Sequence, residues 1–333
     1  MTEITKEKWQ KFSDSHHEAN FLQSVQWGEL HEKLGYVVIR RGVEKDGKLI
    51  AGWQGIVKDA RRGRYLEVPG APLLDWSNTE LIREITEQFR ETAKQQKCVF
   101  VRIRPQLIDT DEHQKILTNA GFKKAPFHLH AEHTNILDLT ETEDEIMAKM
   151  RRQTRYEVRR SVKQNIVVSS SSEVRAIEEF CEVQAETAQR QGFVPSSQKF
   201  LKTLVEAFGE NARVYRAEKD GQLLNLALVL WHGEEVDYFE AASTLESRKF
   251  AGAYGLQWQS IRDAKSAGKT RYNFWGIAYS DDPHHRYAGV TTFKRGFGGD
   301  DTIYVPAHDL VISRVKYIKN WLIETARRKK RRL

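Results

Sequence analysis

Residues 270–300 of this 333-residue chain read TRYNFWGIAYSDDPHHRYAGVTTFKRGFGGD. The segment opens as a short strand, Arg271–Trp275, rich in the aromatic residues that strands favour. A glycine ends the strand, and a polar loop rich in Asp, His and Tyr leads to Thr291–Arg295 and a GFGG sequence. Glycines let a backbone approach a ligand closely, so Lys294 could meet a phosphate or a developing negative charge. The competing interpretation is a tight hairpin with a solvated lysine.

Length and composition limit the number of domains and the class of protein. The chain is long enough for two domains, and 30% charged against 40% hydrophobic residues is typical of a globular protein. No apolar run approaches the ~20 residues of a membrane span, and the polar N-terminus does not resemble a signal peptide. Cys98 and Cys181 are far apart, which fits a reducing cytoplasm. The net charge of +7 favours an anionic partner such as RNA, phosphate or an anionic membrane surface.

An internal repeat gives the clearest view of the organisation. Glu44–Ile50 reads EKDGKLI and Glu218–Leu224 reads EKDGQLL, and in both the Asp-Gly pair predicts a hairpin turn. In the first half a helix at Leu81–Gln95 leads to a strand at Val99–Ile103. In the second half the predicted helix is 253–267 and the strand is 272–275. The shared order favours duplication of one mixed α/β unit.

A strongly basic helix lies between the halves. Thr142 and Glu145 form a capping box, so we expect a helix from there to Lys163, with an apolar stripe at Ile146, Met150, Val158 and Val162. Arg152, Arg155 and Arg159 belong to its basic surface. Such a run is either a solvated face or a contact for a phosphate backbone.

The last predicted helix covers Leu310–Arg328. Val311, Val315, Ile318 and Leu322 are expected to face a core. The basic run 327–332 follows, and it suits anionic lipid or RNA.

The order hairpin, long helix, strand is that of the GNAT acetyltransferase unit. That unit cradles the coenzyme A pyrophosphate with a pattern like Q/R-x-x-G-x-G/A. The corresponding place here, Arg248–Tyr254, has its glycines out of that pattern. We therefore expect no coenzyme A and no other cofactor.

Two such units, the basic helix, a WGI strand end and the FKRGFGG element resemble the FemABX aminoacyltransferases. The strongest segments are Phe21–Gly35, Arg151–Val168 and Tyr272–Gly299. The resemblance implies two tandem GNAT-like domains, each a mixed, mostly antiparallel sheet flanked by helices, without a coiled-coil arm. Domain 1 would comprise residues 1–134 and 306–333, and domain 2 residues 135–305.

The resemblance also implies a reaction. FemABX enzymes move an amino acid from aminoacyl-tRNA to the side-chain amine of a peptidoglycan stem peptide, forming interpeptide bridges of the cell wall. The ester is already activated, so positioning and a cation near the oxyanion or terminal phosphate suffice. Partners would be aminoacyl-tRNA and a UDP-linked or lipid-linked precursor, and we expect a cytoplasmic monomer, peripheral at the inner membrane face.

Site residues follow by resemblance and by chemistry. Lys294, next to Phe293, is the expected catalytic cation, and the arginines of the basic helix together with Arg295 are expected to contact tRNA. By resemblance, Lys33 would bind the precursor diphosphate as the counterpart of a family lysine, although its position in the sequence is shifted. A family arginine that also binds the diphosphate is missing here, and Arg104 could take over part of its role. Aromatic and acidic residues expected to line the acceptor cleft are Tyr238, Glu240 and Tyr254.

Other interpretations remain open at this stage. A GNAT-type N-acetyltransferase would need acetyl-CoA, and a non-enzymatic RNA-binding protein would explain the charge alone. His128, His130 and His133 are considered as metal ligands, because alternation would put the first two on one strand face, but without a cysteine or a second ligand cluster we predict no metal site.

Overall fold

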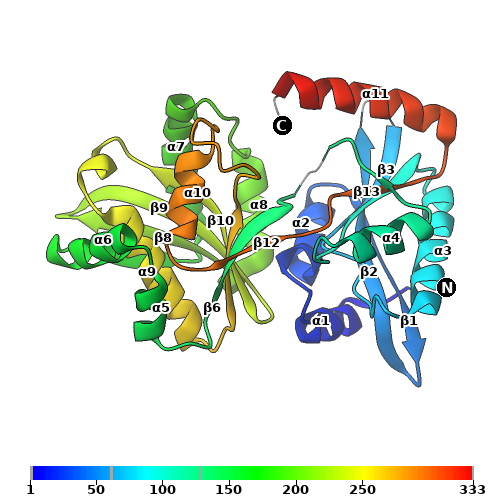
Figure 1. Cartoon of the computed structure of the whole chain (residues 1–333), viewed down its shortest axis with the longest axis horizontal. Coiled ribbons are helices and arrows are strands. Elements are labelled where there is room, and N and C mark those ends of the chain that lie inside the picture. Colours follow the sequence, from blue (N-terminus) through cyan, green and yellow to red (C-terminus); the bar gives the residue numbers. More distant parts are fainter. Residues whose placement is uncertain (1–2, 61–62, 128–129, 332–333) are drawn as a thin grey trace. The chain divides into compact units, whose positions relative to one another are not determined.

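The computed structural model describes residues 3–60, 63–127 and 130–331, and the side chains up to residue 326. Contacts divide the chain into two compact units (Figure 1). Unit 1 comprises Met1–Glu132 and Ile303–Leu333, and unit 2 comprises His133–Thr302. Each unit has a mixed sheet with its own hydrophobic core.

Unit 1 is built on a six-stranded sheet in the order β1-β2-β3-β4-β13-β5. Its strands are β1 (Val37–Lys45), β2 (Lys48–Ala60), β3 (Gly63–Pro69), β4 (Phe100–Arg104), β5 (Lys123–Lys124) and β13 (His308–Val311). Its helices are α1 (Lys6–Ser15), η1 (Phe21–Gln23), α2 (Val25–Lys33), α3 (Thr79–Gln95), α4 (Asp111–Asn119) and α11 (Arg314–Arg331). Asn78 caps α3, whose Ile85 and Phe89 join the core under the sheet.

Unit 2 is built on a seven-stranded sheet in the order β12-β6-β11-β10-β9-β8-β7. Its strands are β6 (His133–Asp138), β7 (Val167–Ser171), β8 (Ala212–Lys219), β9 (Gln222–His232), β10 (Glu235–Ser243), β11 (Arg271–Gly276) and β12 (Asp300–Ile303). Its helices are α5 (Glu143–Lys149), α6 (Arg152–Lys163), α7 (Val174–Gln191), α8 (Gln198–Phe208), η2 (Gly209–Asn211), η3 (Glu246–Lys249), α9 (Gly252–Ser266) and α10 (Ala288–Arg295). Tyr272, Phe274 and Phe297 fill its core.

The sequence repeat is a structural repeat. Asp46 and Asp220 both have φ 51°, and the glycines that follow have φ 74° and 79°, so both hairpins use the same left-handed turn. The pairing register also shifts at matching places, between Val43 and Glu44 and between 217 and 218. In each unit a hairpin, a third strand and a long helix precede a strand that pairs parallel to the third. These matches bear out two GNAT-like sheets.

The basic segment between the repeats is two helices rather than one. The capping box at Thr142 and Glu145 is confirmed, but α5 ends at Lys149 and α6 starts at Arg152. The predicted apolar stripe is buried at Ile146, Met150 and Val158, but it fails at its end, where Val162 is 72% exposed.

The predicted inward face of the last helix is wrong. Val311 lies in β13, while Val315, Ile318 and Leu322 are exposed on α11. The face that packs on the sheet carries Tyr317 instead, whose ring contacts Phe100. Arg332 and Leu333 lie outside the described residues, as do the side chains of the rest of the basic run.

Among the described residues, none of the helices combines the length and apolar content that crossing a membrane requires.

Candidate active site

Lys294 lies on α10 with only 8% of its surface exposed. Its Nζ donates to the carbonyl oxygen of Gly276 at 2.7 Å and sits 5.7 Å from the ring centroid of Tyr238. Burial lowers the pKa of Lys294 to about 7. The interpretation of a hairpin with a solvated lysine is therefore wrong.

The end of β11 positions the carbonyl that Lys294 contacts. Trp275 has φ 58°, an uncommon conformation for a bulky residue, and the pairing with β6 is irregular between Asn273 and Gly276. The side-chain oxygen of Asn273 accepts from the Trp275 amide at 2.8 Å, which supports this turn. Thr291, one turn before Lys294, accepts from the Ala278 amide at 2.8 Å and ties α10 to the same loop.

The glycines after Lys294 serve packing rather than ligand access. A Cβ at Gly296 would lie 2.3 Å from the Thr154 hydroxyl, and one at Gly298 would lie 2.9 Å from the backbone of Lys149. The Gly296 carbonyl also accepts from the Arg151 amide at 2.9 Å. The glycine cluster thus lets the end of α10 pack against the junction of α5 and α6. Protein atoms, and not the open space for a ligand that we expected, lie next to these glycines.

The predicted cleft residues separate into two groups. Tyr238 on β10 contacts Lys294, and burial raises its pKa. Glu240, on the same strand, accepts hydrogen bonds from Gln184 of α7 and Ser196 of the loop before α8. Burial raises the pKa of Glu240, although both hydrogen bonds oppose that change. Tyr238 is therefore the cleft residue that the structure brings to Lys294.

Phe293 and Tyr254 form an aromatic group beside the lysine. Their ring centroids are 5.1 Å apart, and Phe297 lies 5.3 Å from Phe293. Phe293 packs against the core of unit 2, so it fixes the helix turn that carries Lys294. Burial also raises the pKa of Tyr254.

The four arginines expected at tRNA have different environments. Arg152 and Arg159 are exposed on α6. Arg155 donates to the carbonyls of Met147 and Ala148, at 3.2 and 2.9 Å, and so caps the C-terminal end of α5. Arg295 bonds Asp301 at 2.7 Å and Asp281 at 2.6 Å. Arg155 and Arg295 thus have structural contacts that the sequence did not reveal.

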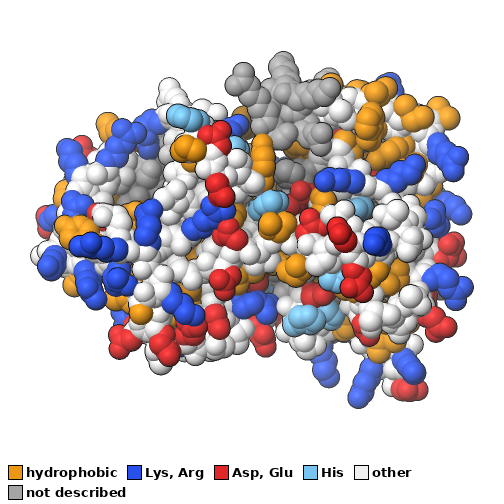
Figure 2. Space-filling model, in the orientation of Figure 1, with side chains coloured by type: hydrophobic (Ala, Val, Ile, Leu, Met, Phe, Trp, Pro, Cys, Tyr) orange, Lys and Arg blue, Asp and Glu red, His pale blue; other side chains and the backbone are white. Residues whose placement is uncertain are grey.

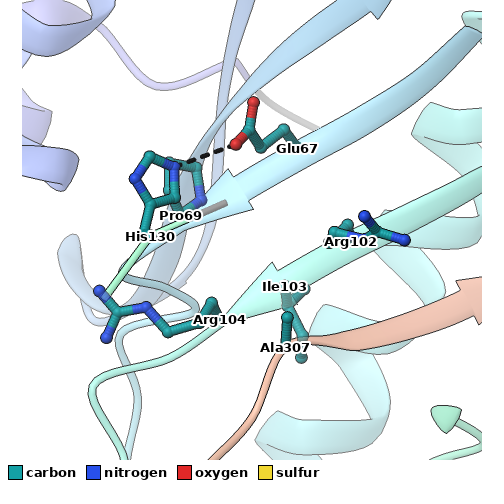
Figure 3. Close-up of a pocket in the computed structure, with 7 residues that line it drawn as sticks. All are labelled: Glu67, Pro69, Arg102, Ile103, Arg104, His130 and Ala307. Atoms are coloured by element: carbon teal, nitrogen blue, oxygen red, sulfur yellow. Dashed lines mark hydrogen bonds and ion pairs between the residues drawn. The ribbon is translucent and has the colours of Figure 1, made fainter. Parts of the chain in front are cut away.

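Arg104 lines a pocket in unit 1, at the ends of the parallel strands β3 and β4 (Figure 3). Its Nη1 donates to Gln106 at 2.6 Å, and its guanidinium lies 5.3 Å from the Tyr304 ring. Figure 3 shows Arg104 on the same side of β4 as His130, whose Nε2 lies 3.0 Å from the Glu67 carboxylate. This pocket combines a guanidinium and an imidazole with a carboxylate.

A buried polar cluster extends from this pocket, and sequence reasoning missed it. Lys58 Nζ lies 3.9 Å from Glu67, 3.1 Å from His31 Nδ1 and 4.0 Å from the Tyr36 ring centroid. Burial favours a raised pKa for Glu67, but the bond with His130 and the charge of Lys58 lower it to about 2. Burial lowers the pKa of His31 to about 3. The signal available in the sequence was Glu67 between Leu66 and Val68, and Lys58 directly after the apolar pair Ile56-Val57.

The lysine predicted for the diphosphate lies elsewhere. Lys33 is exposed in the last turn of α2. Lys58, and not Lys33, is the lysine that lies half-buried beside the pocket residue Glu67.

The histidines considered as metal ligands have separate places in the fold where the structure describes them. His130 bonds Glu67 in unit 1, while His133 begins β6 in unit 2, and His128 lies outside the described residues. No group of three or more His, Cys, Asp or Glu that could hold a metal occurs in the described ranges.

Comparison with known proteins places this geometry in a family. The chain is 21% identical to the lipid II:glycine glycyltransferase of Staphylococcus aureus (strain USA300), over 94% of this chain and 93% of that protein. It is similar in fold to the crystal structure of FemX, with a TM-score of 0.88, 20% identity and coverage of 97% and 99% of the two chains. It also resembles a tandem GNAT protein from the clavulanic acid biosynthesis pathway, with a TM-score of 0.52, 13% identity and 83% coverage of each chain.

The family model describing the FemAB family matches residues 4–222 and 214–325. These ranges include both repeats, the basic helix α6, the strand end at Gly276 and Lys294. The chain belongs to the FemAB family.

Proposed function

We propose that this protein transfers an amino acid from aminoacyl-tRNA to the side-chain amine of a peptidoglycan precursor, with a lipid-linked precursor as the favoured acceptor. Membership of the FemAB family and the similarity to a lipid II:glycine glycyltransferase support an aminoacyltransferase of interpeptide bridge formation. The observation that carries the site assignment is the buried Lys294 beside the Gly276 carbonyl and the Tyr238 ring.

The reaction requires little covalent chemistry from the protein itself. The acceptor amine attacks the ester carbonyl, the C–N bond forms, and the tRNA 3′ oxygen leaves with the electron pair of the broken C–O bond. The amine loses a proton, and the 3′ oxygen gains one. The remaining requirement is to stabilise the oxyanion that develops between these steps.

Lys294 can supply that stabilisation in its charged form. An ammonium group has three donors, and the Gly276 carbonyl accepts one of them at 2.7 Å. The hydrogen bond and the packing of Phe293 fix the direction of the side chain, so donors are oriented before the substrate arrives. Tyr238 closes one side with an aromatic face that tolerates a cation.

The precursor's diphosphate is proposed to bind at the unit 1 pocket. Arg104 offers a planar guanidinium that matches phosphate oxygens. Glu67 would repel an anion, but His130 and Lys58 surround its carboxylate and offset its charge. The Arg104→Gln variant should raise KM for the precursor at least several-fold while KM for aminoacyl-tRNA stays unchanged. A Lys33→Gln variant is the matched control, and a larger effect there would move the diphosphate to α2.

Coenzyme A is not expected as a co-substrate. The Ala251 amide at the start of α9 donates to the Gln164 side chain at 2.8 Å, so an amide that could meet a phosphate is engaged within the protein. A Cβ at Gly252 would lie 2.4 Å from Asn225, which shows how closely this helix start is packed.

A transfer assay tests the proposed function. The protein is incubated with a mixture of charged tRNAs and, separately, UDP-linked and lipid-linked precursors, and products are identified by mass. We expect an added amino acid on a precursor, dependent on aminoacyl-tRNA. Acetyl transfer from acetyl-CoA, or tRNA binding without any product, would overturn the proposal.

A further inference from the structure

Helix α11 packs on the unit 1 sheet with a polar face and leaves an apolar face exposed, the reverse of a helix that packs on a hydrophobic core. The residues turned toward the unit 1 sheet are Tyr317, Asn320 and Glu324, which recur at the helical spacing i, i+3, i+7. The residues at the same spacing two positions earlier are apolar, namely Val315, Ile318 and Leu322. At 3.6 residues per turn these two stripes lie on roughly opposite sides of the helix.

Polar contacts account for the inward face. The Tyr317 hydroxyl donates to Asp309 at 2.8 Å, and Arg102 bridges Asp309 and Glu324, each at 2.8 Å. Asp309 is fully buried, and it pairs with Arg102 on the neighbouring strand. This network fixes the rotation of α11 about its axis, so the apolar stripe cannot turn inward without breaking buried ion pairs.

The outward face is apolar and flanked by cations. Val315 is 84% exposed, Ile318 58% and Leu322 57%, and Trp321 beside them is 42% exposed. Figure 2 shows hydrophobic side chains gathered where Figure 1 places α11. Arg314, Lys316 and Lys319 are exposed along the two margins of this stripe. The only acid in the helix sequence, Glu324, is turned inward to Arg102.

We infer that α11 is a membrane-surface helix, whose stripe of Val315, Ile318 and Leu322 inserts into the interface of an anionic phospholipid bilayer. An apolar face bordered by Lys and Arg with an aromatic residue at its margin suits the boundary between headgroups and acyl chains. The basic residues at the margins of the stripe favour an anionic membrane surface over an uncharged apolar partner. The inference concerns binding and does not depend on the transfer reaction.

Vesicle sedimentation tests this inference with the full chain. Wild type should sediment with vesicles of phosphatidylcholine and phosphatidylglycerol, and far less with phosphatidylcholine alone. The double variant Ile318→Ser and Leu322→Ser should bind the anionic vesicles about tenfold more weakly, because it removes apolar area from the interface. The control Val194→Ser and Leu245→Ser, at positions 94% and 58% exposed in unit 2, should bind as wild type.

A charge variant separates the two contributions. Lys316→Glu with Lys319→Glu should remove the preference for anionic over neutral vesicles. Unchanged thermal unfolding would show that the inward network is intact in every variant. The transfer of an amino acid to a water-soluble precursor should also stay unchanged, which separates this inference from the proposed function.

Four outcomes would overturn the inference. The first is a wild type that does not sediment with anionic vesicles. The second is a serine variant that binds them as tightly as wild type. The third is a wild-type dimer, measured by analytical ultracentrifugation, that the serine variant converts to monomer, since a second copy would then be the occupant. Loss of tRNA affinity in the serine variant would likewise assign the stripe to RNA.

Discussion

In unit 1, the buried Glu67 contacts the half-buried His130 and Lys58, whereas in unit 2 Lys294 is buried against a carbonyl and an aromatic ring. The same physical term, loss of hydration, opposes both charges. The hydrogen bond with His130 and the nearby positive charges hold the pKa of Glu67 down to about 2, so it stays ionised. A carbonyl offers only a partial charge, so burial lowers the pKa of Lys294 to about 7.

The comparison separates a structural group from a reactive one. The unit 1 cluster is compensated internally, so its removal should affect folding first. Lys294 is held in a costly state that folding alone does not require, and buried groups with perturbed pKa values concentrate at functional sites.

The largest effect is expected for the Lys294→Met variant. Transfer should fall by about a hundredfold or more, on the order of 3 kcal/mol, as for a lost oxyanion donor. Lys294→Arg should keep part of the activity, because the guanidinium is charged but larger and planar. Single-turnover rates with aminoacyl-tRNA measure both.

Lys265 provides the matched control for that variant. It is a half-buried lysine of unit 2 that donates to the Leu139 carbonyl at 2.9 Å. Lys265→Met should transfer at the wild-type rate. A folded Lys294→Met protein with near wild-type transfer would remove this lysine from the mechanism.

Glu67→Gln should destabilise unit 1 by about 2 kcal/mol at pH 7, the value of a hydrogen bond to a charged group. Because the folded-state pKa of Glu67 is lowered, its contribution is present above pH 4.5 and disappears as pH falls from 4.5 to about 2. Denaturant unfolding should therefore show a difference in the free energy of unfolding between wild type and Glu67→Gln that is smaller at pH 3 than at pH 7. Glu44→Gln, which breaks a surface pair with Lys8, should cost less than ~1 kcal/mol. An equal loss in both variants would contradict the buried-cluster assignment.

Lys294→Met should gain stability at low pH relative to wild type. The folded-state pKa of about 7 is below the ordinary 10.5, so between these values the unfolded chain binds more protons. Wild-type stability thus rises with pH from about 7 to 10.5, and below pH 7 the full cost of burying the charge applies. The advantage of the Met variant should shrink by at least the order of 1 kcal/mol between pH 6 and pH 10. Thermal or denaturant unfolding that shows a constant difference over this range would refute the assigned pKa.

The smallest effect is expected on α6. Arg152→Glu with Arg159→Glu should weaken tRNA binding and reduce its salt dependence by about 0.7–0.9 per lost phosphate contact. Arg155 is left unchanged, because its guanidinium caps α5 and its loss would alter the fold. Filter binding at several salt concentrations measures the slope, and an unchanged slope would make α6 a solvated face.

Local chemistry determined much of the fold from the sequence. The Asp-Gly turns at Asp46 and Asp220, the capping box at Thr142 and the helix leading to Val99 all depend on neighbours a few residues apart. Such short-range preferences act before tertiary contacts form, so they can be read from sequence. The FKRGFGG element, together with the family resemblance, led to Lys294.

Tertiary structure decided the environments of the charged residues. Whether Lys294 is solvated or buried depends on α10 packing beside β11, about twenty residues earlier in the chain. The cluster around Glu67 joins residues from α2, β2 and the segment before β6. The apolar and the polar stripe of α11 both have helical spacing. The buried Asp309–Arg102 pair holds the polar stripe against the sheet. Periodicity determined that α11 is a helix, but only the electrostatics of the partner strand determined which face it buries.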